Sequence, residues 1–350
     1  MTTAVVTAPG VAAPTTDPSQ LLQLAEGMHA IEVVAAAVGW LDLFERLDAA
    51  PADTRTIARD LELAERPTHV MLTLLRTLGL VRCDDAGRHA LTPLASEYLL
   101  ARSPWSVAPV FEALAARPAC REMLRVLRTG APLTFAPDDD GDGWADRMSD
   151  EMFAEMFLTT TDSRNAYLAH ALAETVGDAP FHRLLDVGGG SGIYASALAQ
   201  RNPDLSATVF EKPPVDAIAR RALERRGLAG RVDAVAGDML VDELPPGYDA
   251  HLFSNVVHDW EEREVARLLR ASFETLVPGG TILVHDALLD EDGDGPLPVA
   301  QYSVLLMAFT AGRCYSLGEI VALLEAAGFE QIAHRRTVVD RTLVTAVKPD

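Results

Sequence analysis

The segment Leu184–Gly192, with the sequence LLDVGGGSG, combines a carboxylate with a glycine-rich turn. The turn follows an apolar run and opens a helical segment, and glycines at such a point let the backbone approach a ligand closely. In one register, Gly190-x-Gly192-x-x-Ala195, the turn also fits the dinucleotide fingerprint. Asp186 favours a different ligand, because its carboxylate would repel a pyrophosphate but attract the ammonium and sulfonium of S-adenosylmethionine (SAM). Hydrogen bonding of Asp186 to the turn amides alone is the alternative.

Two further acidic positions follow in chain order. Glu211 ends the next apolar run, 23 residues after Gly188, a spacing at which a carboxylate can accept hydrogen bonds from both ribose hydroxyls. Asp238 and Met239 follow the third run; the first can accept from an adenine amino group, and the second can lie against the ring face. Together with Gly188 and Gly190 in the turn, these residues predict a SAM site. For Glu211, a solvated surface acid is the alternative.

The fourth apolar run ends in Phe253–Trp260, with the sequence FSNVVHDW. Ser254, at the end of this run, is counted with the cofactor-binding residues. His258 is a candidate general base, because an imidazole with an ordinary pKa near ~6.5 can remove the proton of a phenol at neutral pH. A histidine that only hydrogen-bonds in the cleft is the alternative, since much of the acceleration of a methyl transfer can come from positioning alone.

The elements that would position these residues alternate between strand and helix from Arg183 onward. Such alternation with glycine-rich turns predicts an α/β fold with a doubly wound parallel sheet. Two final apolar runs, 331–336 and 343–347, have only a short turn between them, so an antiparallel hairpin should close the sheet. The expected strands are 183–187, 207–210, 232–235, 249–257 and 281–285, and the expected helices are 192–201, 214–227, 261–276 and 316–327.

The first third of the chain has the pattern of a winged-helix module. A helix is expected from Leu21 to about Leu47, and two short helices joined by a turn follow at 56–61 and 67–80. Apolar residues then flank an Asp-Asp-Ala-Gly turn at 84–87, which predicts a hairpin.

A winged helix often binds DNA, and dimerisation is the competing role. The second short helix carries only Arg66, His69 and Arg76 as cations. The formal net charge of −21 would repel a duplex and an anionic membrane surface. We therefore expect a dimerisation module, with neither a nucleic-acid nor a membrane partner.

Four regions follow from these patterns. They are a disordered tail over 1–20, the winged-helix dimerisation domain over 21–104, a helical linker and substrate-cleft region over 105–176, and the SAM-binding domain over 177–350. In the third region, residues 105–130 are expected to be helical, residues 131–150 to form a linker, and a long helix to run from about Ser149 to Val176. Its stripe Met152, Phe153, Met156 and Phe157 suits either the core or the wall of a substrate pocket, and Phe157 is a candidate for the latter.

Cysteine usage and the N-terminal composition bear on the compartment. Cys83, Cys120 and Cys314 are widely spaced and form no CxxC pair, which favours a reducing cytoplasm. The first 20 residues lack the charged and apolar regions of a signal peptide. No stretch of 18 apolar residues is free of a polar break, so no membrane-spanning helix is expected.

Two aspartate-rich loops resemble the start of a calcium loop. They begin at Asp138 and Asp290, but their twelfth positions are Ser149 and Gln301 where a glutamate is required. We expect acidic loops and no metal site.

The motif order, the winged-helix module before it and the His-Asp-Trp triplet resemble the SAM-dependent small-molecule O-methyltransferases, which include plant caffeate-type enzymes and bacterial antibiotic-tailoring enzymes. The resemblance covers about 20–348. It implies a homodimer whose N-terminal helices cap the partner's cleft, a small aromatic acceptor, and His258 as the general base. Asp286 stands where the family has a glutamate that holds this imidazole.

One position departs from the family pattern. Where the family reads Gly-Lys-Glu-Arg-Thr, this chain has Gly312–Ser316, so that Cys314 replaces the glutamate. The resemblance places Cys314 at the acceptor pocket. It also implies that the apolar segment 299–309, with Met307, lines this pocket, and core packing of the segment is the alternative. The departure leaves room for a carbon or nitrogen acceptor. The resemblance also permits SAM-assisted hydroxylation or pericyclic rearrangement on the same scaffold, and a DNA-binding regulator that senses SAM is a third alternative.

Overall fold

The computed structural model describes residues 14–133, 144–178 and 180–350. They form two compact units. The first comprises residues up to Leu22 together with Trp144–Leu288 and Gly318–Asp350, and the second comprises Gln23–Gly143 and Leu289–Leu317. The first 13 residues of the expected tail and half of the expected linker, 134–143, lie outside the described residues.

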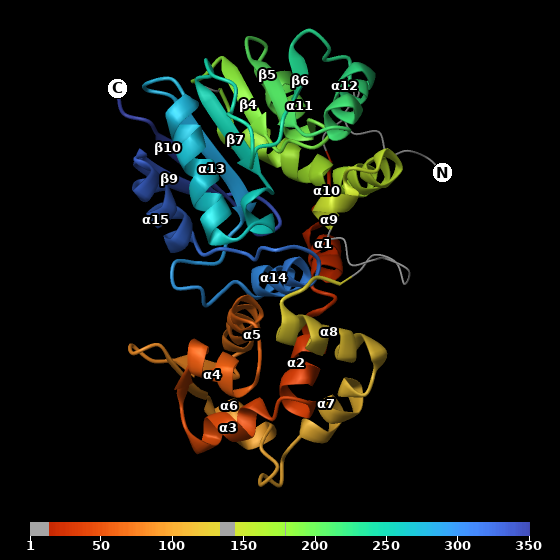
Figure 1. Cartoon of the computed structure of the whole chain (residues 1–350), viewed down its shortest axis with the longest axis vertical. Helices are drawn as coiled ribbons and strands as arrows, with labels where there is room; N and C mark the ends of the chain where they lie inside the picture. The colour runs from red at the N-terminus through yellow and green to blue at the C-terminus, as the bar shows by residue number, and fades with distance from the viewer. Residues whose placement is uncertain (1–13, 134–143, 179) are drawn as a thin grey trace. The chain divides into compact units, whose positions relative to one another are not determined.

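The first unit is built on a seven-stranded sheet with the order β6-β5-β4-β7-β8-β10-β9 (Figure 1). The first five strands in this order are parallel, and β10 runs antiparallel between β8 and β9. The sequence-based prediction of a doubly wound sheet closed by a hairpin is confirmed. The strands are β4 (Arg183–Val187), β5 (Ser206–Glu211), β6 (Val232–Ala236), β7 (Ala250–Ser254), β8 (Thr281–Ala287), β9 (Glu330–Arg336) and β10 (Arg341–Val347).

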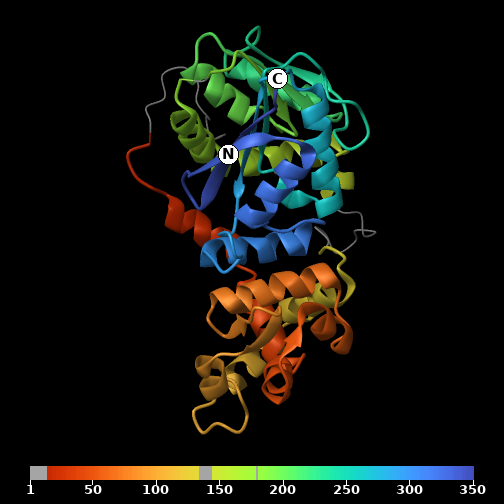
Figure 2. The ribbon, with the colours of Figure 1, turned by 90° about the vertical axis from the view of Figure 1, so that its left-hand side faces the viewer.

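Helices cover the sheet because its parallel strands are apolar on both faces. The long helix α10 (Glu151–Val176), with α11 (Ile193–Arg201) and α12 (Val215–Arg225), packs on one face in a shared core. The α13 helix (Glu262–Thr275) contacts the end of α15 (Leu317–Ala327), where Arg270 donates to the Ala327 carbonyl; the two helices lie side by side in Figures 1 and 2. This arrangement leaves the carboxyl ends of β4 to β8 at one edge of the sheet.

The second unit contains the winged-helix module that the sequence predicts. Its short helices α4 (Thr54–Asp60) and α5 (Glu65–Thr77) are followed by β2 (Val81–Cys83) and β3 (Arg88–Leu91), which pair antiparallel. Asp84 closes the turn between them, since its carboxylate accepts from the amides of Ala86 and Arg88. The other elements are α2 (Ala30–Gly39), α3 (Leu43–Ala49), β1 (Ala52–Asp53), α6 (Pro93–Tyr98), α7 (Ala108–Ala115), α8 (Pro118–Thr129) and α14 (Leu297–Phe309).

Three expected helical features are wrong in detail. The helix expected over 21–47 is divided into α1 (Ser19–Glu26), α2 and α3; Asp42, before α3, has a left-handed backbone with φ of +52°, which interrupts a right-handed helix. The region 105–130 divides at Arg117, whose backbone is extended because it precedes Pro118. The expected linker contains a short helix, α9 (Trp144–Arg147).

The segment Ser19–Gly39 is long and apolar enough to cross a membrane by length and composition. In the structure it is interrupted between α1 and α2. Val33 and Ala35 on α2 are fully buried in the core of the second unit, and 39% of the most apolar window of the segment is buried.

Candidate active site

The glycine turn connects β4 to α11 in a conformation that needs glycine. Gly188 and Gly190 have φ values of +66° and +57°, in the left-handed region that other residues rarely adopt. A Cβ atom at Gly189 would lie 2.5 Å from the Asp186 carboxyl carbon. The turn therefore closes tightly over Asp186.

Asp186 is fully buried beneath this turn. Its Oδ2 accepts a hydrogen bond from the Ala195 amide at 3.3 Å, whereas Oδ1 has no partner within the described parts of the chain. Burial, with a smaller contribution from the charge of Glu211, raises the pKa of Asp186 to about 7. A buried acceptor without a donor is the group that a cationic ligand would satisfy.

Glu211 lies at the end of the neighbouring strand and contacts the turn directly. Its carboxylate accepts from the amides of Gly190, at 3.0 Å, and Lys212, at 3.1 Å. Burial raises the pKa of Glu211 to about 7, and the charge of Asp238 adds to this. The carboxyl ends of β4 and β5 thus bring Asp186 and Glu211 together beside one turn.

A cavity of about 290 Å³ lies at this edge of the sheet. Its wall contains four of the expected cofactor residues, Gly188, Glu211, Asp238 and Met239. A Cβ atom at Gly188 would lie 3.3 Å from the Met239 sulfur, so the two residues form one continuous surface. The remaining lining residues come from α9 and the following turn, from β5 and the segments that follow β5, β6 and β7, and from the start of α12: Trp144, Ala145, Asp146, Met148, Phe210, Lys212, Val215, Gly237, Leu240, Asn255, Val256, Asp259 and Trp260.

Ser254 is directed away from this lining. Its hydroxyl lies 2.9 Å from Nδ1 of His285, whose Nε2 lies 3.0 Å from the Thr337 hydroxyl. Burial lowers the pKa of His285 to about 3, so this imidazole is a neutral structural group. The next residue, Asn255, lines the cavity instead. Sequence reasoning missed Asn255, although its place at the end of a parallel strand is a signal for ligand contact.

His258 and Asp286 form a buried pair close to the cavity. His258 lies on the 3₁₀ turn η1 (Val257–Asp259), and its Nδ1 is hydrogen-bonded to Oδ1 of Asp286 on β8. Nε2 lies 3.7 Å from the Asp259 carboxylate, which lines the cavity. The expected orientation of His258 by Asp286 therefore corresponds to a direct contact.

Each member of the His258–Asp286 pair stabilises the charged form of the other. Burial by itself lowers the pKa of His258, but the carboxylates of Asp286 and Asp259 outweigh it and raise the pKa above its usual value. Burial raises the pKa of Asp286, but the His258 imidazolium and its hydrogen bond more than offset this, so the pKa is lowered. Burial raises the pKa of Asp259 to about 6.

Aromatic rings from α9 and α10 stack next to the cavity. Phe157 stacks on Trp144 with ring centroids 5.7 Å apart and on Phe153 at 6.1 Å. Trp144 and Trp260, 6.4 Å apart, both line the cavity, whereas Phe157 reaches it only through Trp144. Sequence reasoning placed Trp144 in a linker and missed this wall.

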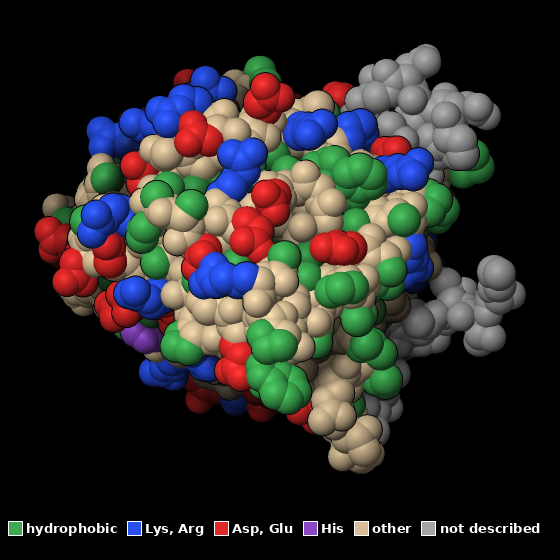
Figure 3. All heavy atoms as spheres, turned by 90° about the horizontal axis from the view of Figure 1, so that it is seen from below, with side chains coloured by type: hydrophobic (Ala, Val, Ile, Leu, Met, Phe, Trp, Pro, Cys, Tyr) green, Lys and Arg blue, Asp and Glu red, His purple; other side chains and the backbone are tan. Residues whose placement is uncertain are grey.

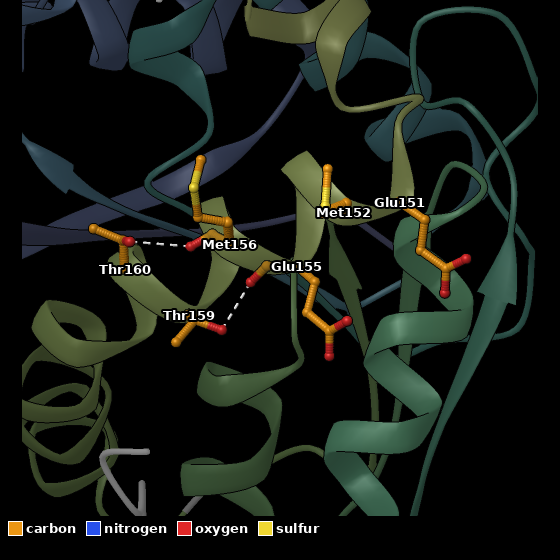
Figure 4. Close-up of a pocket in the computed structure, with 6 residues that line it drawn as sticks. All are labelled: Glu151, Met152, Glu155, Met156, Thr159 and Thr160. Atoms are coloured by element: carbon orange, nitrogen blue, oxygen red, sulfur yellow. Dashed lines mark hydrogen bonds between the residues drawn. The ribbon is translucent and has the colours of Figure 1, made fainter. Parts of the chain in front are cut away.

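The stripe expected on α10 is divided between two faces. Phe153 and Phe157 pack inward against a small core, whereas Met152 and Met156 are 81% and 59% exposed. Figure 4 shows these methionines with their neighbours on the outer face of α10, where they line a shallow pocket.

Met307 and Cys314 belong to the second unit and are both buried there. The Met307 carbonyl accepts from Arg66 at 3.3 Å, and the Cys314 amide donates to the Ser303 hydroxyl at 3.1 Å. All three cysteines of the chain are free thiols. The assignment of Met307 and Cys314 to an acceptor pocket stays a prediction.

The two arginines of α5 make contacts within the same unit. Arg66 also donates to the carbonyls of Gly130 and Gly312, and Arg76 forms an ion pair with Asp294. These guanidinium groups are therefore engaged with protein atoms at the helix that would have to contact DNA.

The described residues contain no group of three or more His, Cys, Asp or Glu side chains that could hold a metal ion. Of the two aspartate-rich loops, the one beginning at Asp138 lies outside the described residues. In the other, Asp290 accepts from the Asp294 amide at 2.8 Å, so the loop is closed on itself.

Comparison with known proteins gives a consistent result over both units. Residues 134–330 match the O-methyltransferase domain, and residues 22–102 match the O-methyltransferase dimerisation domain. The 3-hydroxy-5-methyl-1-naphthoate 3-O-methyltransferase of Streptomyces sahachiroi is 33% identical over 317 residues, which are 90% of each chain.

Two solved structures extend this result. The O-methyltransferase family 2 protein of Planctomyces limnophilus, in complex with apigenin, has a TM-score of 0.86 at 32% identity and covers 98% of this chain and 100% of its own. Human N-acetylserotonin methyltransferase, in complex with SAM, has a TM-score of 0.59 at 25% identity, with 97% and 100% covered. With its glycine turn, acidic strand ends and both domain matches, this chain belongs to the SAM-dependent O-methyltransferases.

Proposed function

We propose that this enzyme transfers the methyl group of SAM to a phenolic hydroxyl of a small aromatic molecule, with His258 as general base and Asp286 as the residue that orients it. One observation carries the proposal. The buried His258–Asp286 pair adjoins Asp259 and Trp260, which line the cavity at the carboxyl ends of the parallel strands.

The residues of the cavity fit SAM. Glu211, in the lining, would accept from the ribose hydroxyls. Asp186 lies beneath the glycine turn and outside this lining, and its unpartnered oxygen would face the cationic end of the cofactor. Asp238 and Met239 would hold the adenine. When bound, SAM supplies a methyl group made electrophilic by its sulfonium.

His258 would act through Nε2. The hydrogen bond to Asp286 places the imidazole proton on Nδ1, so Nε2 is the nitrogen that accepts the phenolic proton. Nε2 would take the proton of the acceptor hydroxyl, whose oxygen would receive the methyl group that bound SAM supplies, with S-adenosylhomocysteine as the leaving product. Asp286, fully buried, stabilises the resulting imidazolium.

Acceptor chemistry is inferred from the relatives. One is named for a hydroxynaphthoate and another is bound to apigenin, so we propose a fused or linked aromatic ring system that carries a phenolic hydroxyl. Phe157, Met307 and Cys314 remain the candidates for acceptor contacts. With Cys314 in place of the family glutamate, Asp286 is the carboxylate assigned to orient the base.

A direct experiment separates binding from chemistry. His258→Ala should leave the dissociation constant of S-adenosylhomocysteine (SAH) nearly unchanged and lower turnover by roughly 10²–10⁴-fold, the usual contribution of a general base. Turnover is measured with methyl-labelled SAM on a panel of hydroxynaphthoates and flavones, and fragmentation of the product locates the label on oxygen, carbon or nitrogen. Nearly normal turnover of His258→Ala, or label on carbon, would contradict the proposal.

We also propose a homodimer formed through the second unit. The dimerisation-domain match lies in this unit, and Figure 3 shows hydrophobic side chains among the charged ones on the face seen from below. Exposed large apolar side chains on a soluble protein favour an interface. Those in this unit are Leu24, Met28, Ile31, Trp40, Leu94, Tyr98, Trp105, Val107 and Val110.

A further inference from the structure

A buried polar cluster lies beside the glycine turn and outside the cavity lining. It joins Asp162 on α10, Ser191 in the turn and Arg226 at the end of α12. The Ser191 hydroxyl donates to Asp162 Oδ2 at 2.7 Å and accepts from Arg226 Nη2 at 2.9 Å. Arg226 also donates through Nη1 to the Ser191 carbonyl at 2.7 Å and through Nη2 to Asp162 at 3.0 Å.

Two members of this cluster, Ser191 and Arg226, are buried, and Asp162 is partly buried. Arg226 is 7% exposed and Ser191 is 3% exposed, and the Asp162 side chain is 18% exposed. A buried guanidinium is tolerated when its charge is paired and its donors are used, and removing one partner leaves the other uncompensated. The cluster is therefore a directional contact, unlike the exposed ion pairs of the same unit.

Because Ser191 lies within the glycine turn, the cluster restricts the conformation of that turn. Ser191 lies between Gly190 and Gly192, both with left-handed backbones, and glycines lose more conformational freedom on ordering than other residues. Three hydrogen bonds hold Ser191, and the preceding residue, Gly190, donates to Glu211. Fixing Ser191 thus fixes the amide that faces Glu211.

We propose that Asp162 and Arg226 are positioning residues that clamp Ser191 and hold the glycine turn in its SAM-binding conformation before the cofactor arrives. This inference rests on the proposed placement of SAM at the turn. Preorganisation lowers the ordering cost that binding must otherwise meet, so the clamp should act on affinity for SAM and SAH and leave the acceptor and the chemical step unaffected.

The test compares Arg226→Gln with a matched control. Arg221→Gln removes an exposed ion pair, Arg221–Glu151, that joins the same two helices without touching the turn. Arg226→Gln should raise the dissociation constant of SAH, measured by calorimetry, and the KM for SAM by about tenfold, equivalent to ~1.4 kcal/mol. The KM for the acceptor and kcat should change less than about twofold, because the glycine turn that Arg226 holds contacts the cofactor and not the acceptor. Arg221→Gln should match wild type.

Hydrogen exchange provides a readout that does not depend on activity. Amides 188–192 of the ligand-free protein should exchange faster in Arg226→Gln than in Arg221→Gln. Arg226→Lys, which keeps the charge, should recover part of the SAH affinity. Equal losses for SAM and acceptor, or unchanged exchange in the turn, would overturn the clamp.

Ser191→Ala keeps the test decisive if Arg226→Gln fails to fold. It removes one hydroxyl and keeps the Asp162–Arg226 ion pair, and it should weaken SAH binding by several-fold.

Glu211→Gln separates the clamp from the proposed cofactor site. If Glu211→Gln binds SAH normally, the placement of SAM is wrong; if it loses binding while Ser191→Ala and Arg226→Gln do not, the clamp alone is wrong.

Discussion

Replacing Asp286 with Asn keeps the shape of the side chain and removes its charge. In the protein, the Asp286 carboxylate accepts from Nδ1 of His258 at a position with no exposure to solvent, so water cannot take its place. An amide can donate to Nδ1 instead, which would place the imidazole proton on Nε2. Nε2 is the nitrogen that must accept the phenolic proton, and the variant therefore leaves the base present but in the wrong tautomer.

The expected loss follows from that change. General-base catalysis contributes ~10²–10⁴-fold, and we expect kcat to fall by about that factor. The pH dependence should also move. The charge of Asp286 helps raise the pKa of His258 above 6.5, and only the neutral imidazole is active, so wild-type kcat/KM should rise with pH through a pKa above that value. Without this charge, only Asp259 opposes the effect of burial, so the pKa of His258 should be lower than in the wild type and the rising limb of the variant should lie at lower pH.

Single-turnover transfer from methyl-labelled SAM measures the chemical step, and calorimetry measures SAH affinity in the same samples. SAH affinity should change less than about threefold, since Asp286 acts on the base rather than on the cofactor. The double variant His258→Ala/Asp286→Asn should be no slower than His258→Ala, because the two residues act as one unit. A rate within threefold of wild type, or an unmoved pH limb, would refute the reasoning.

Three further predictions concern the cofactor site and the dimer. The pKa of Asp186 in the folded protein is raised to about 7, so the charge of its carboxylate destabilises the ligand-free fold increasingly as the pH rises from about 4 to 7. Asp186→Asn should therefore raise the melting temperature at pH 8 by at least about 2 °C. The same variant should bind SAH more weakly in calorimetry. A Cβ at Gly237 would overlap the Phe210 ring, so Gly237→Ala should weaken SAH binding by about tenfold and lose stability, with partial recovery on adding Phe210→Leu. Trp105, 68% exposed, should anchor the dimer, and light scattering of Trp105→Asp should show a monomer where Trp105→Phe remains dimeric.

Local patterns predicted the elements well where burial made the pattern strong. The parallel strands are covered on both faces, so they appear in the sequence as short continuous apolar runs. The run expected at 249–257 ends as a strand at Ser254 because the chain turns at Asn255, which has a left-handed φ of +52°. The hairpin was predictable, but its second strand, β10, is the one that pairs with β8, a choice made by long-range pairing.

Apart from Asn255, the unpredicted parts of the site depend on contacts between distant segments. Trp144 reaches the cavity from a short helix that has no strong periodicity of its own. Arg226 meets Asp162 across 64 residues. Each side chain was visible in the sequence, but nothing in its neighbourhood indicated its partner.

The amino-acid sequence by itself determined the alternation of strands and helices, the glycine turn after Asp186, and the order of acidic residues at later strand ends, because these depend on spacing within single strand–turn–helix units. Tertiary structure decided that His258 meets Asp286. Strands β7 and β8 pair in the register that sets Ser254 opposite His285, and this brings η1 over the end of β8. A shift of one residue would turn Asp286 to the other face of the sheet, because side chains alternate along a strand.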